Sequence, residues 1–292
     1  MCCSLPFRVN FPLRSGALAL ASVWALWSVC ALQGAWAEES AAPDTPAPPT
    51  FNYAIGAIVG NGPDYAGGDG RKNSLRPAWA MEYGRFRLST SRGSAFMGHG
   101  LAAGTRESGA SATLAQSDRF SLSAALRIDK GRDGSDAPIL VGLPSVRSTL
   151  RARLSAGYAL TDHWSVGAGV SQDILGRDGG AQLSTSVGYA WPLTDQTKVT
   201  IGAGASFGDH TYLQGHFGVP AGGASPLPAF DPRAGLYSVD GGVEVMSAIN
   251  RHWVVLGAAR VSQLKGDARR SPLTVEPVGY SVSVGLAYRC CR

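Results

Sequence analysis

Residues 280–288, YSVSVGLAY, alternate strictly between large and small side chains near the end of the chain. Every second residue from Tyr280 to Tyr288 is large and apolar, and the residues between them are serine, glycine or alanine. Because successive side chains of a β-strand point to opposite faces, this period of two predicts a strand. A half-buried strand of a soluble sheet would have a polar outer face. Here neither face carries a charge, which raises the question of what lies on each side.

The same alternation recurs along most of the chain. Many of the segments are long enough to cross a bilayer at a tilt, which takes about 9–11 residues, and no segment after residue 37 approaches the length of a membrane helix. The pattern predicts an all-β fold, a transmembrane antiparallel β-barrel of about twelve strands, within a range of roughly 10–14. The expected strands lie near residues 51–60, 75–83, 85–92, 95–103, 118–129, 145–160, 164–174, 182–191, 198–207, 235–246, 253–264 and 278–288.

Two features favour a membrane barrel over a secreted, soluble β-sandwich. The faces that are not apolar are filled by glycine and serine, whereas a sandwich needs polar outer faces. Aromatic residues such as Tyr158, Trp164, Trp191 and Trp253 mark strand ends, as in the interfacial girdles of outer-membrane barrels. We therefore expect lipid on the Tyr/Val/Leu side of residues 280–288 and a lumen on the Ser/Gly/Ala side.

The first residues of the chain resemble an export signal. Arg8 and Arg14 precede an apolar run over residues 16–32, and Ala35-Trp36-Ala37 follows. This order predicts a signal peptide over residues 1–37, cleaved after Ala37; the alternative is a retained membrane anchor. Residues 38–50 are rich in proline, alanine and acidic residues and predict a flexible leader. The barrel would then occupy residues 51–292, and the protein would lie in the cell outer membrane, in contact with its lipid.

Charge and cysteine content exclude some classes of function. Removal of residues 1–37 takes away two basic and no acidic residues, so the formal net charge falls from +5 to +3. The remaining basic residues are scattered, which gives no support for nucleic-acid binding. Only the adjacent Cys290 and Cys291 remain, and neighbouring cysteines rarely pair with each other, so we expect no disulfide framework.

The lengths of the connections predict an orientation. Those at Gly84 and at 161–163, 192–197 and 247–252 are short, and those at 61–73, 130–144, 208–233 and 265–277 are long. Outer-membrane barrels have short periplasmic turns and long outer loops, so we expect both termini in the periplasm. The long polar stretch 104–117 contradicts this rule, because it falls on the periplasmic side.

Several arginines occupy strand positions that face away from lipid. An arginine on the lipid face at the bilayer midplane would cost about 2–4 kcal/mol, which requires these side chains to point inward. Their functional interpretation is an anion-attracting lumen; the alternative is a bore filled by ion pairs, which a barrel of this size favours. The arginines are Arg127, Arg147, Arg151 and Arg153, and the inward carboxylates available to pair with them are Glu82, Asp173, Asp240 and Glu244.

No constellation of residues indicates catalysis or a bound cofactor. His210 and His216 with Asp209 lack further metal ligands and a rigid frame, and no Ser-His-Asp spacing stands out. Asp64 and Asp69 lie among glycines without the ligand run of a calcium loop. We expect a protein that is not an enzyme and has no cofactor and no metal site.

Three segments together resemble the MipA/OmpV family of outer-membrane proteins. The first is GPDYAGGDGRKNSLRPAWAMEYGRFRLS, residues 62–89, with Pro63, Tyr65, Gly67, Asp69 and Pro77 at the family's positions. The second is residues 208–225, with His216 at an aromatic position before Phe217, Gly218 and Val219. The third is residues 259–273, with Arg260, Leu264, Asp267, Ser271 and Pro272.

The resemblance implies an outer-membrane barrel that binds rather than catalyses. One member of the family is known as a scaffold joining a lytic murein transglycosylase to a murein synthase, and others are immunogenic or adhesive surface proteins. The first expectation is therefore a scaffold or interaction protein for periplasmic murein hydrolases and synthases. The alternatives are a narrow channel for small solutes and a surface-exposed adhesin, and the oligomeric state is left open.

Overall fold

The computed structural model describes residues 51–90, 93–97, 109–134, 137–222 and 225–290 of the 292-residue chain. The expected signal peptide, residues 1–37, and the leader, residues 38–50, lie outside these described residues. No helix in the described ranges is long and apolar enough to cross a membrane.

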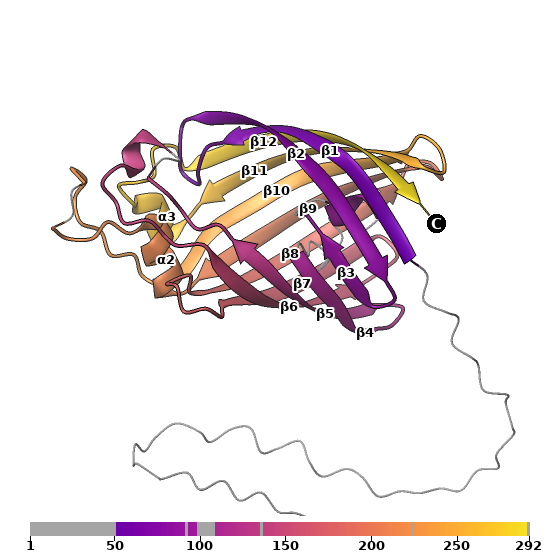
Figure 1. Ribbon diagram of the computed structural model, residues 1–292, viewed down its shortest axis with the longest axis horizontal. Helices are drawn as coiled ribbons and strands as arrows, with labels where there is room; N and C mark the ends of the chain where they lie inside the picture. Colours follow the sequence, from indigo (N-terminus) through magenta and orange to yellow (C-terminus); the bar gives the residue numbers. More distant parts are fainter. Residues whose placement is uncertain (1–50, 91–92, 98–108, 135–136, 223–224, 291–292) are drawn as a thin grey trace, which may run out of the picture. The chain divides into compact units, whose positions relative to one another are not determined.

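Twelve strands in the described part of the chain form one closed barrel, which confirms the predicted fold class and strand number (Figure 1). Each strand pairs antiparallel with its neighbours in the sequence, and β1 closes the barrel against β12. In chain order the elements are β1 (Phe51–Pro63), β2 (Arg71–Tyr83), β3 (Phe86–Ser89), α1 (Gly93–Phe96), β4 (Gly109–Gln116), β5 (Phe120–Asp129), the 3₁₀ helix η1 (Pro138–Leu140), β6 (Thr149–Ala159), β7 (Trp164–Asp173), β8 (Ala181–Pro192), β9 (Thr197–Gly208), α2 (His210–Phe217), β10 (Gly235–Ala248), β11 (Trp253–Leu264), α3 (Gly266–Arg270) and β12 (Val278–Cys290).

The two faces of β12 have the environments that its alternation predicts. Val282 and Val284 are 54% and 56% exposed on the outside of the barrel, whereas Ser283 and Ala287 are buried on the inside. The outer faces of the other strands likewise carry exposed valine, leucine and isoleucine. A soluble protein rarely exposes a continuous apolar surface of this kind, and hydrocarbon is the solvent that fits it.

The two ends of the barrel differ in the length of their connections. Turns of two to four residues, at 84–85, 117–119, 160–163, 193–196 and 249–252, join strands at one end, where β1 begins and β12 ends. At the other end the connections at 64–70, 130–148, 174–180, 209–234 and 265–277 are longer and contain η1, α2 and α3. Aromatic side chains such as Trp164 and Trp253 ring the short-turn end, where each packs edge-on against a tyrosine of the next strand. We therefore call the short-turn end periplasmic and the long-loop end outer.

The expected strand at 95–103 is wrong. Residues 93–97 instead form α1 and a following turn residue, and residues 98–103 lie outside the described part of the chain. The strand that completes the barrel is β4, within the stretch 104–117 that seemed to break the orientation rule. The alternation of β4 is weak because small residues occupy both of its faces. The apolar Phe96 and Met97, which suggested a strand, are instead buried completely in the lumen. With β4 in place, the connection at 117–119 is a short periplasmic turn and the rule holds.

Cys290, where β12 ends, is disulfide-bonded. The other four cysteines, Cys2, Cys3, Cys30 and Cys291, lie outside the described residues, so the expectation of no disulfide framework stays a prediction.

Candidate functional site: the lumen and the outer cap

The α1 segment, residues 93–97, leaves the barrel wall and packs inside the lumen. Directly after β3, Thr90 makes two hydrogen bonds to Trp79 of β2. The Thr90 main-chain N–H donates to the Trp79 carbonyl at 3.0 Å, and the Trp79 N–H donates to the Thr90 hydroxyl at 3.0 Å. Phe96 and Met97 then join a buried cluster with inward residues of β1, β2, β11 and β12. Gly285 of β12 makes room for them, since a Cβ atom there would lie 2.8 Å from the Phe96 ring. The lumen is thus narrowed by apolar side chains in this region.

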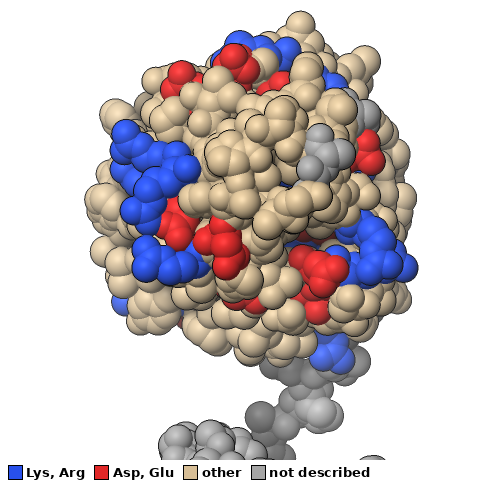
Figure 2. All heavy atoms as spheres, turned by 90° about the vertical axis from the view of Figure 1, so that its left-hand side faces the viewer, with Lys and Arg blue, Asp and Glu red and all other residues tan. Residues whose placement is uncertain are grey.

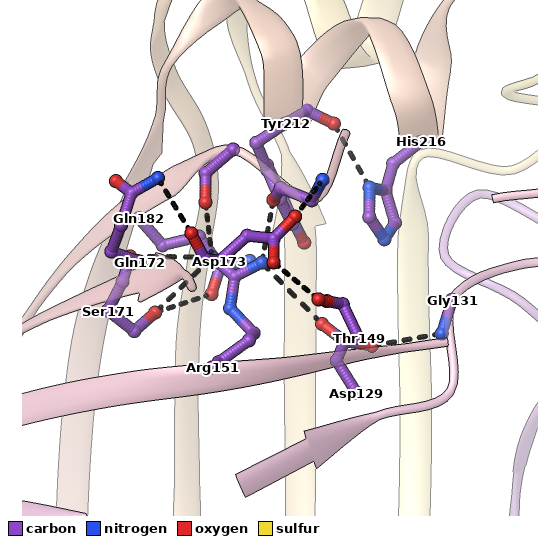
Figure 3. Close-up of polar contacts among 12 residues, drawn as sticks. Asp129, Gly131, Thr149, Arg151, Ser171, Gln172, Asp173, Gln182, Tyr212 and His216 are labelled. Carbon is purple, nitrogen blue, oxygen red and sulfur yellow. Dashed lines mark hydrogen bonds and ion pairs between the residues drawn. The ribbon is translucent and has the colours of Figure 1, made fainter. Parts of the chain in front are cut away.

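A polar network around Arg151 joins the barrel wall to the outer loops (Figure 3). The Arg151 side chain is almost fully buried, donates to the main-chain carbonyls of Gly179 and Gly180 at 2.6 and 3.0 Å, and lies 3.7 Å from a carboxylate oxygen of Asp129. Its guanidinium carbon also lies 5.6 Å from the centre of the Tyr212 ring in α2. One charged side chain therefore contacts the β5 end, the β7–β8 loop and α2.

Asp173, directly across the strand pair from Arg151, holds the β7–β8 loop rather than an arginine side chain. Its carboxylate accepts hydrogen bonds from the main-chain N–H groups of Leu175, Arg177 and Gly179 at 2.9, 2.6 and 3.0 Å, and another from the Thr149 hydroxyl. A carboxylate that accepts several such hydrogen bonds is held ionised. The carboxylate that Arg151 approaches is Asp129, which sequence reasoning missed although it has the same strand parity as Arg127.

The remaining members of the expected charge network take several different partners. Glu82 pairs with Arg87 at 2.6 Å, and Asp240 lies 3.7 Å from Arg260 on the neighbouring strand. Arg153 donates to the hydroxyls of Ser155 and Ser184, each at 2.9 Å. The lumen thus contains paired charges, with partners other than those the sequence suggested.

The last three expected members of the charge network differ in how far they are buried and in where they lie along the chain. Glu244 occupies a half-buried position on β10. Arg127 has the expected inward parity on β5, opposite Arg151, and is exposed. Arg147 lies in the loop before β6 and is exposed, so its expected place on an inward strand face is wrong.

The outer loops fold together into a cap over the barrel mouth. We call their described residues within 64–70, 130–148, 174–180, 209–234 and 265–277 the outer cap. One hydrophobic cluster in it collects side chains from loops that start at four separate places around the barrel: Tyr65 of the first loop, Ala137, Ile139, Leu140 and Leu143 of the second, Val219, Leu227 and Phe230 of the fourth, and Leu273 of the last. Contacts from so many sides place this cluster across the mouth. Figure 2 shows this face, with charged residues mainly toward the margin and uncharged residues over much of the middle.

The three segments that carry the family resemblance meet in the outer cap. The Tyr65 hydroxyl donates to the Leu273 carbonyl at 2.9 Å, and Gly67, with φ of 100°, offers its carbonyl to the N–H of Val275 at 2.8 Å. The Ser271 hydroxyl donates to the Phe217 carbonyl at 2.6 Å, and Leu264 packs in one cluster with Phe217. The motifs far apart in the sequence therefore form one structural unit.

The other residues of the family motifs lie at the end of α2, in α3, at the end of β1 or in the outer loops. Gly218 ends α2, and Val219 bridges to Phe230 in the cap. Asp267 accepts a hydrogen bond from the Arg233 N–H at 2.8 Å and pairs with Arg270, which lowers the pKa of its carboxyl to about 2. Pro63 ends β1 against Arg71, Asp69 is exposed in the following loop, and Pro272 lies between two residues of the cap.

The histidines considered as metal ligands have other roles. Asp209 caps α2 by accepting from the Tyr212 N–H at 2.7 Å, and His210 lies 2.8 Å from Asp231. His216 stacks on the Tyr212 ring at 4.2 Å, and burial lowers the pKa of its imidazole. The described residues contain no group of three or more histidine, cysteine, aspartate or glutamate side chains that could hold a metal ion.

A family model described as MltA-interacting protein MipA matches residues 55–290 of the chain. The chain belongs to this family. The match begins in β1 and ends with β12, so it covers the whole barrel together with the cap. This MipA-family chain is an outer-membrane β-barrel. Among curated proteins, no sequence matches it.

Solved structures of outer-membrane channels are also similar to the chain. The NanC porin is 5% identical with a TM-score of 0.41, and the match covers 80% of this chain and 98% of that chain. The KdgM porin is 12% identical with a TM-score of 0.38, over 80% and 98% of the two chains. An outer-membrane channel from Pseudomonas putida F1 is 12% identical with a TM-score of 0.40, over 86% and 100%.

Proposed function

We propose that this protein is a non-enzymatic interaction protein of the outer membrane that holds periplasmic murein-remodelling enzymes at the inner surface of that membrane. The observation that carries the proposal is the folded outer cap. A hydrophobic cluster built from four loops lies across the outer mouth, and apolar side chains of the α1 segment narrow the lumen below it. A barrel obstructed in this way is poorly suited to free diffusion of solutes, which leaves binding as the function to explain.

The periplasmic end offers a surface on which a partner could dock. A hollow of about 560 Å³ lies beside the short turn between β8 and β9 and reaches the inner faces of β10 and β11. Its lining combines the apolar Leu193, Met246 and Val254 with the charged Asp195, Lys198 and Arg289. Apolar side chains bordered by charged ones are the usual composition of a protein-binding surface.

The family description suggests the class of partner. The family model names an MltA-interacting protein, and for this chain that name supports a periplasmic murein enzyme as the partner. A surface adhesin would instead use the outer cap, and a narrow channel would require the α1 segment and the cap to move aside.

Site-specific photocrosslinking in intact cells tests the proposal. A photoreactive residue replaces Leu193, which is half exposed in the periplasmic turn; the matched control replaces Ala229, which is exposed in the outer cap. We expect a murein hydrolase or synthase to be captured from the Leu193 position and not from the Ala229 position. Capture from the cap alone, or capture of no murein enzyme from either position, would overturn the scaffold role.

Planar-bilayer recordings of the purified protein test the obstructed bore separately. We expect low or no conductance. Large and stable channels in the unmodified protein would favour solute transport over interaction.

A further inference from the structure

A polar cavity lies inside the barrel between the α1 segment and the outer cap. It measures about 470 Å³ and follows the outer halves of β1, β2 and β12. This volume falls within the usual range of small-molecule sites, about 300–1,000 Å³. Ile58, Ala78 and Thr90 lie at its α1 end, and Asp64 lies at its cap end.

Three basic side chains converge on this cavity. Lys72 and Arg76 lie on the inward face of β2 with Ser74 between them, on the same face that buries Ala78 and Ala80 farther along the strand. Lys130 reaches the cavity from the first position after β5. Lys72 lies outside the strand expected from the sequence, which begins at residue 75, because β2 extends outward to Arg71.

Unlike several basic residues of the lumen, these three cations have no ion-pair partner among the described residues. Arg87, Arg151 and Arg260 each lie within 4 Å of a carboxylate. Within the described ranges, Lys72, Arg76 and Lys130 form neither an ion pair nor a side-chain hydrogen bond, and all three are exposed to water.

The described lining of the cavity contains little negative charge to balance them. Asp64 is the one carboxylate among these described residues, and an oxygen of that carboxylate already accepts the Tyr65 N–H at 2.9 Å. Like charges gathered in a cleft with low-dielectric walls create a positive potential that concentrates anions.

The floor of the cavity leaves room for a ligand and offers it hydroxyl groups. Gly60 and Gly62 of β1 lie opposite Ser74 and Lys72 of β2, so one side of the floor has no side chains beyond hydrogen. Ser281 and Ser283 of β12 lie on the other side of these glycines. Serine hydroxyls both donate and accept hydrogen bonds and suit the polar groups of a small solute.

We propose that this cavity binds a small organic anion with carboxylate or phosphate groups. Lys72, Arg76 and Lys130 hold the charged groups, and the serines of the floor contact neutral hydroxyls of the same molecule. The site is independent of the periplasmic hollow, because it lies in the outer half of the lumen.

Calorimetric titration of the folded protein in detergent micelles tests this site. Citrate and inorganic phosphate serve as probes for the two anion classes, with ionic strength matched by sodium chloride. Binding should be lost or weakened at least tenfold in the variant Lys72→Gln/Arg76→Gln/Lys130→Gln. It should be unchanged in the control variant Arg85→Gln/Arg119→Gln/Arg251→Gln, which removes equal charge from exposed periplasmic turns.

A second variant keeps every charge and fills the floor instead. Ser74→Phe places a ring between Lys72 and Arg76 and should also abolish binding, while the unheated protein still migrates as a folded barrel. The proposal is overturned if neither probe binds the unmodified protein, if the control variant loses as much affinity as the cavity variant, or if Ser74→Phe binds as the unmodified protein does.

Discussion

The hydroxyl of Tyr65 donates a hydrogen bond of 2.9 Å to the main-chain carbonyl of Leu273, across 208 residues of sequence. It joins the first outer loop to the last, at the place where β1 and β12 close the barrel. Burial, together with the nearby Asp64 and Asp69, raises the pKa of this phenol to about 12, so the hydroxyl remains a donor at every physiological pH.

Tyr65→Phe should loosen the outer cap without unfolding the barrel. The lost hydrogen bond contributes about 1 kcal/mol, which corresponds to roughly a fivefold increase in the open population of the loops. The measurement is the rate of limited proteolysis within 265–277. Tyr83→Phe, at an exposed residue of the periplasmic end, is the control and should leave that rate unchanged. Equal rates in all three proteins would show that the bond does not hold the cap.

Arg151→Met should destabilise the folded protein. It removes the charge that faces Asp129 and the donors to Gly179 and Gly180, which leaves a partly buried carboxylate and two carbonyls uncompensated. Breaking a buried pair in this way costs about 3 kcal/mol or more. Urea unfolding, followed by loss of the fast-migrating folded band, measures the change. Arg127→Met removes the exposed arginine opposite and should alter stability by no more than about 0.5 kcal/mol; a similar loss in both variants would argue against a specific role for Arg151.

Phe96→Ala should release the α1 segment from the lumen wall. Loss of a fully buried phenylalanine costs about 3–5 kcal/mol, which exceeds a hundredfold change in local opening. The probe is a thiol introduced by Ala95→Cys, at a buried position, whose rate of alkylation reports opening. We expect faster alkylation in the Phe96→Ala background and no change with Leu154→Ala on the lipid face. Unchanged protection would mean that α1 is held by other contacts.

The stability of the cap should fall as the pH drops below the ordinary histidine pKa of 6.5. Burial lowers the pKa of His216 in the folded state, opposed by its hydrogen bond to the Tyr212 carbonyl and by Asp129, and assisted by Arg132 and Arg151. The unfolded cap then binds a proton at a higher pH than the folded cap does, so stability is lost between 6.5 and the lower folded pKa. Proteolysis of the outer loops from pH 7.5 to 5 measures this loss. His216→Asn should flatten the profile; a profile unchanged by that substitution would assign the pH dependence to another group.

Export should remove residues 1–37 and leave Glu38 as the first residue of the mature protein. The basic head, the apolar run and Ala35-Trp36-Ala37 carry this prediction. Sequencing the N-terminus of protein extracted from outer membranes checks it, and Ala37→Leu should slow processing. A mature chain that still begins at Met1 would favour the retained anchor.

The fold could be predicted because a barrel in lipid imposes a simple rule on every strand. An outward residue meets hydrocarbon and an inward residue meets a confined space, so alternation alone identifies β12 and most of its neighbours. The rule fails at β4, where Ala110 and Ala112 differ little in bulk from Ser111 and Thr113. It fails at α1 for the opposite reason, since Phe96 and Met97 look like strand residues but owe their apolar character to burial in the lumen.

The sequence by itself determined the class of fold, the approximate number of strands, the faces of those strands and the family, because each depends on local alternation or on short motifs. Only the tertiary structure decided which charges pair and which do not. Arg151 meets Asp129, whereas Lys72, Arg76 and Lys130 face a shared cavity, since the register between neighbouring strands and the course of the outer loops determine those distances. Strand parity tells which side a residue faces; closure of the barrel determines what it meets there.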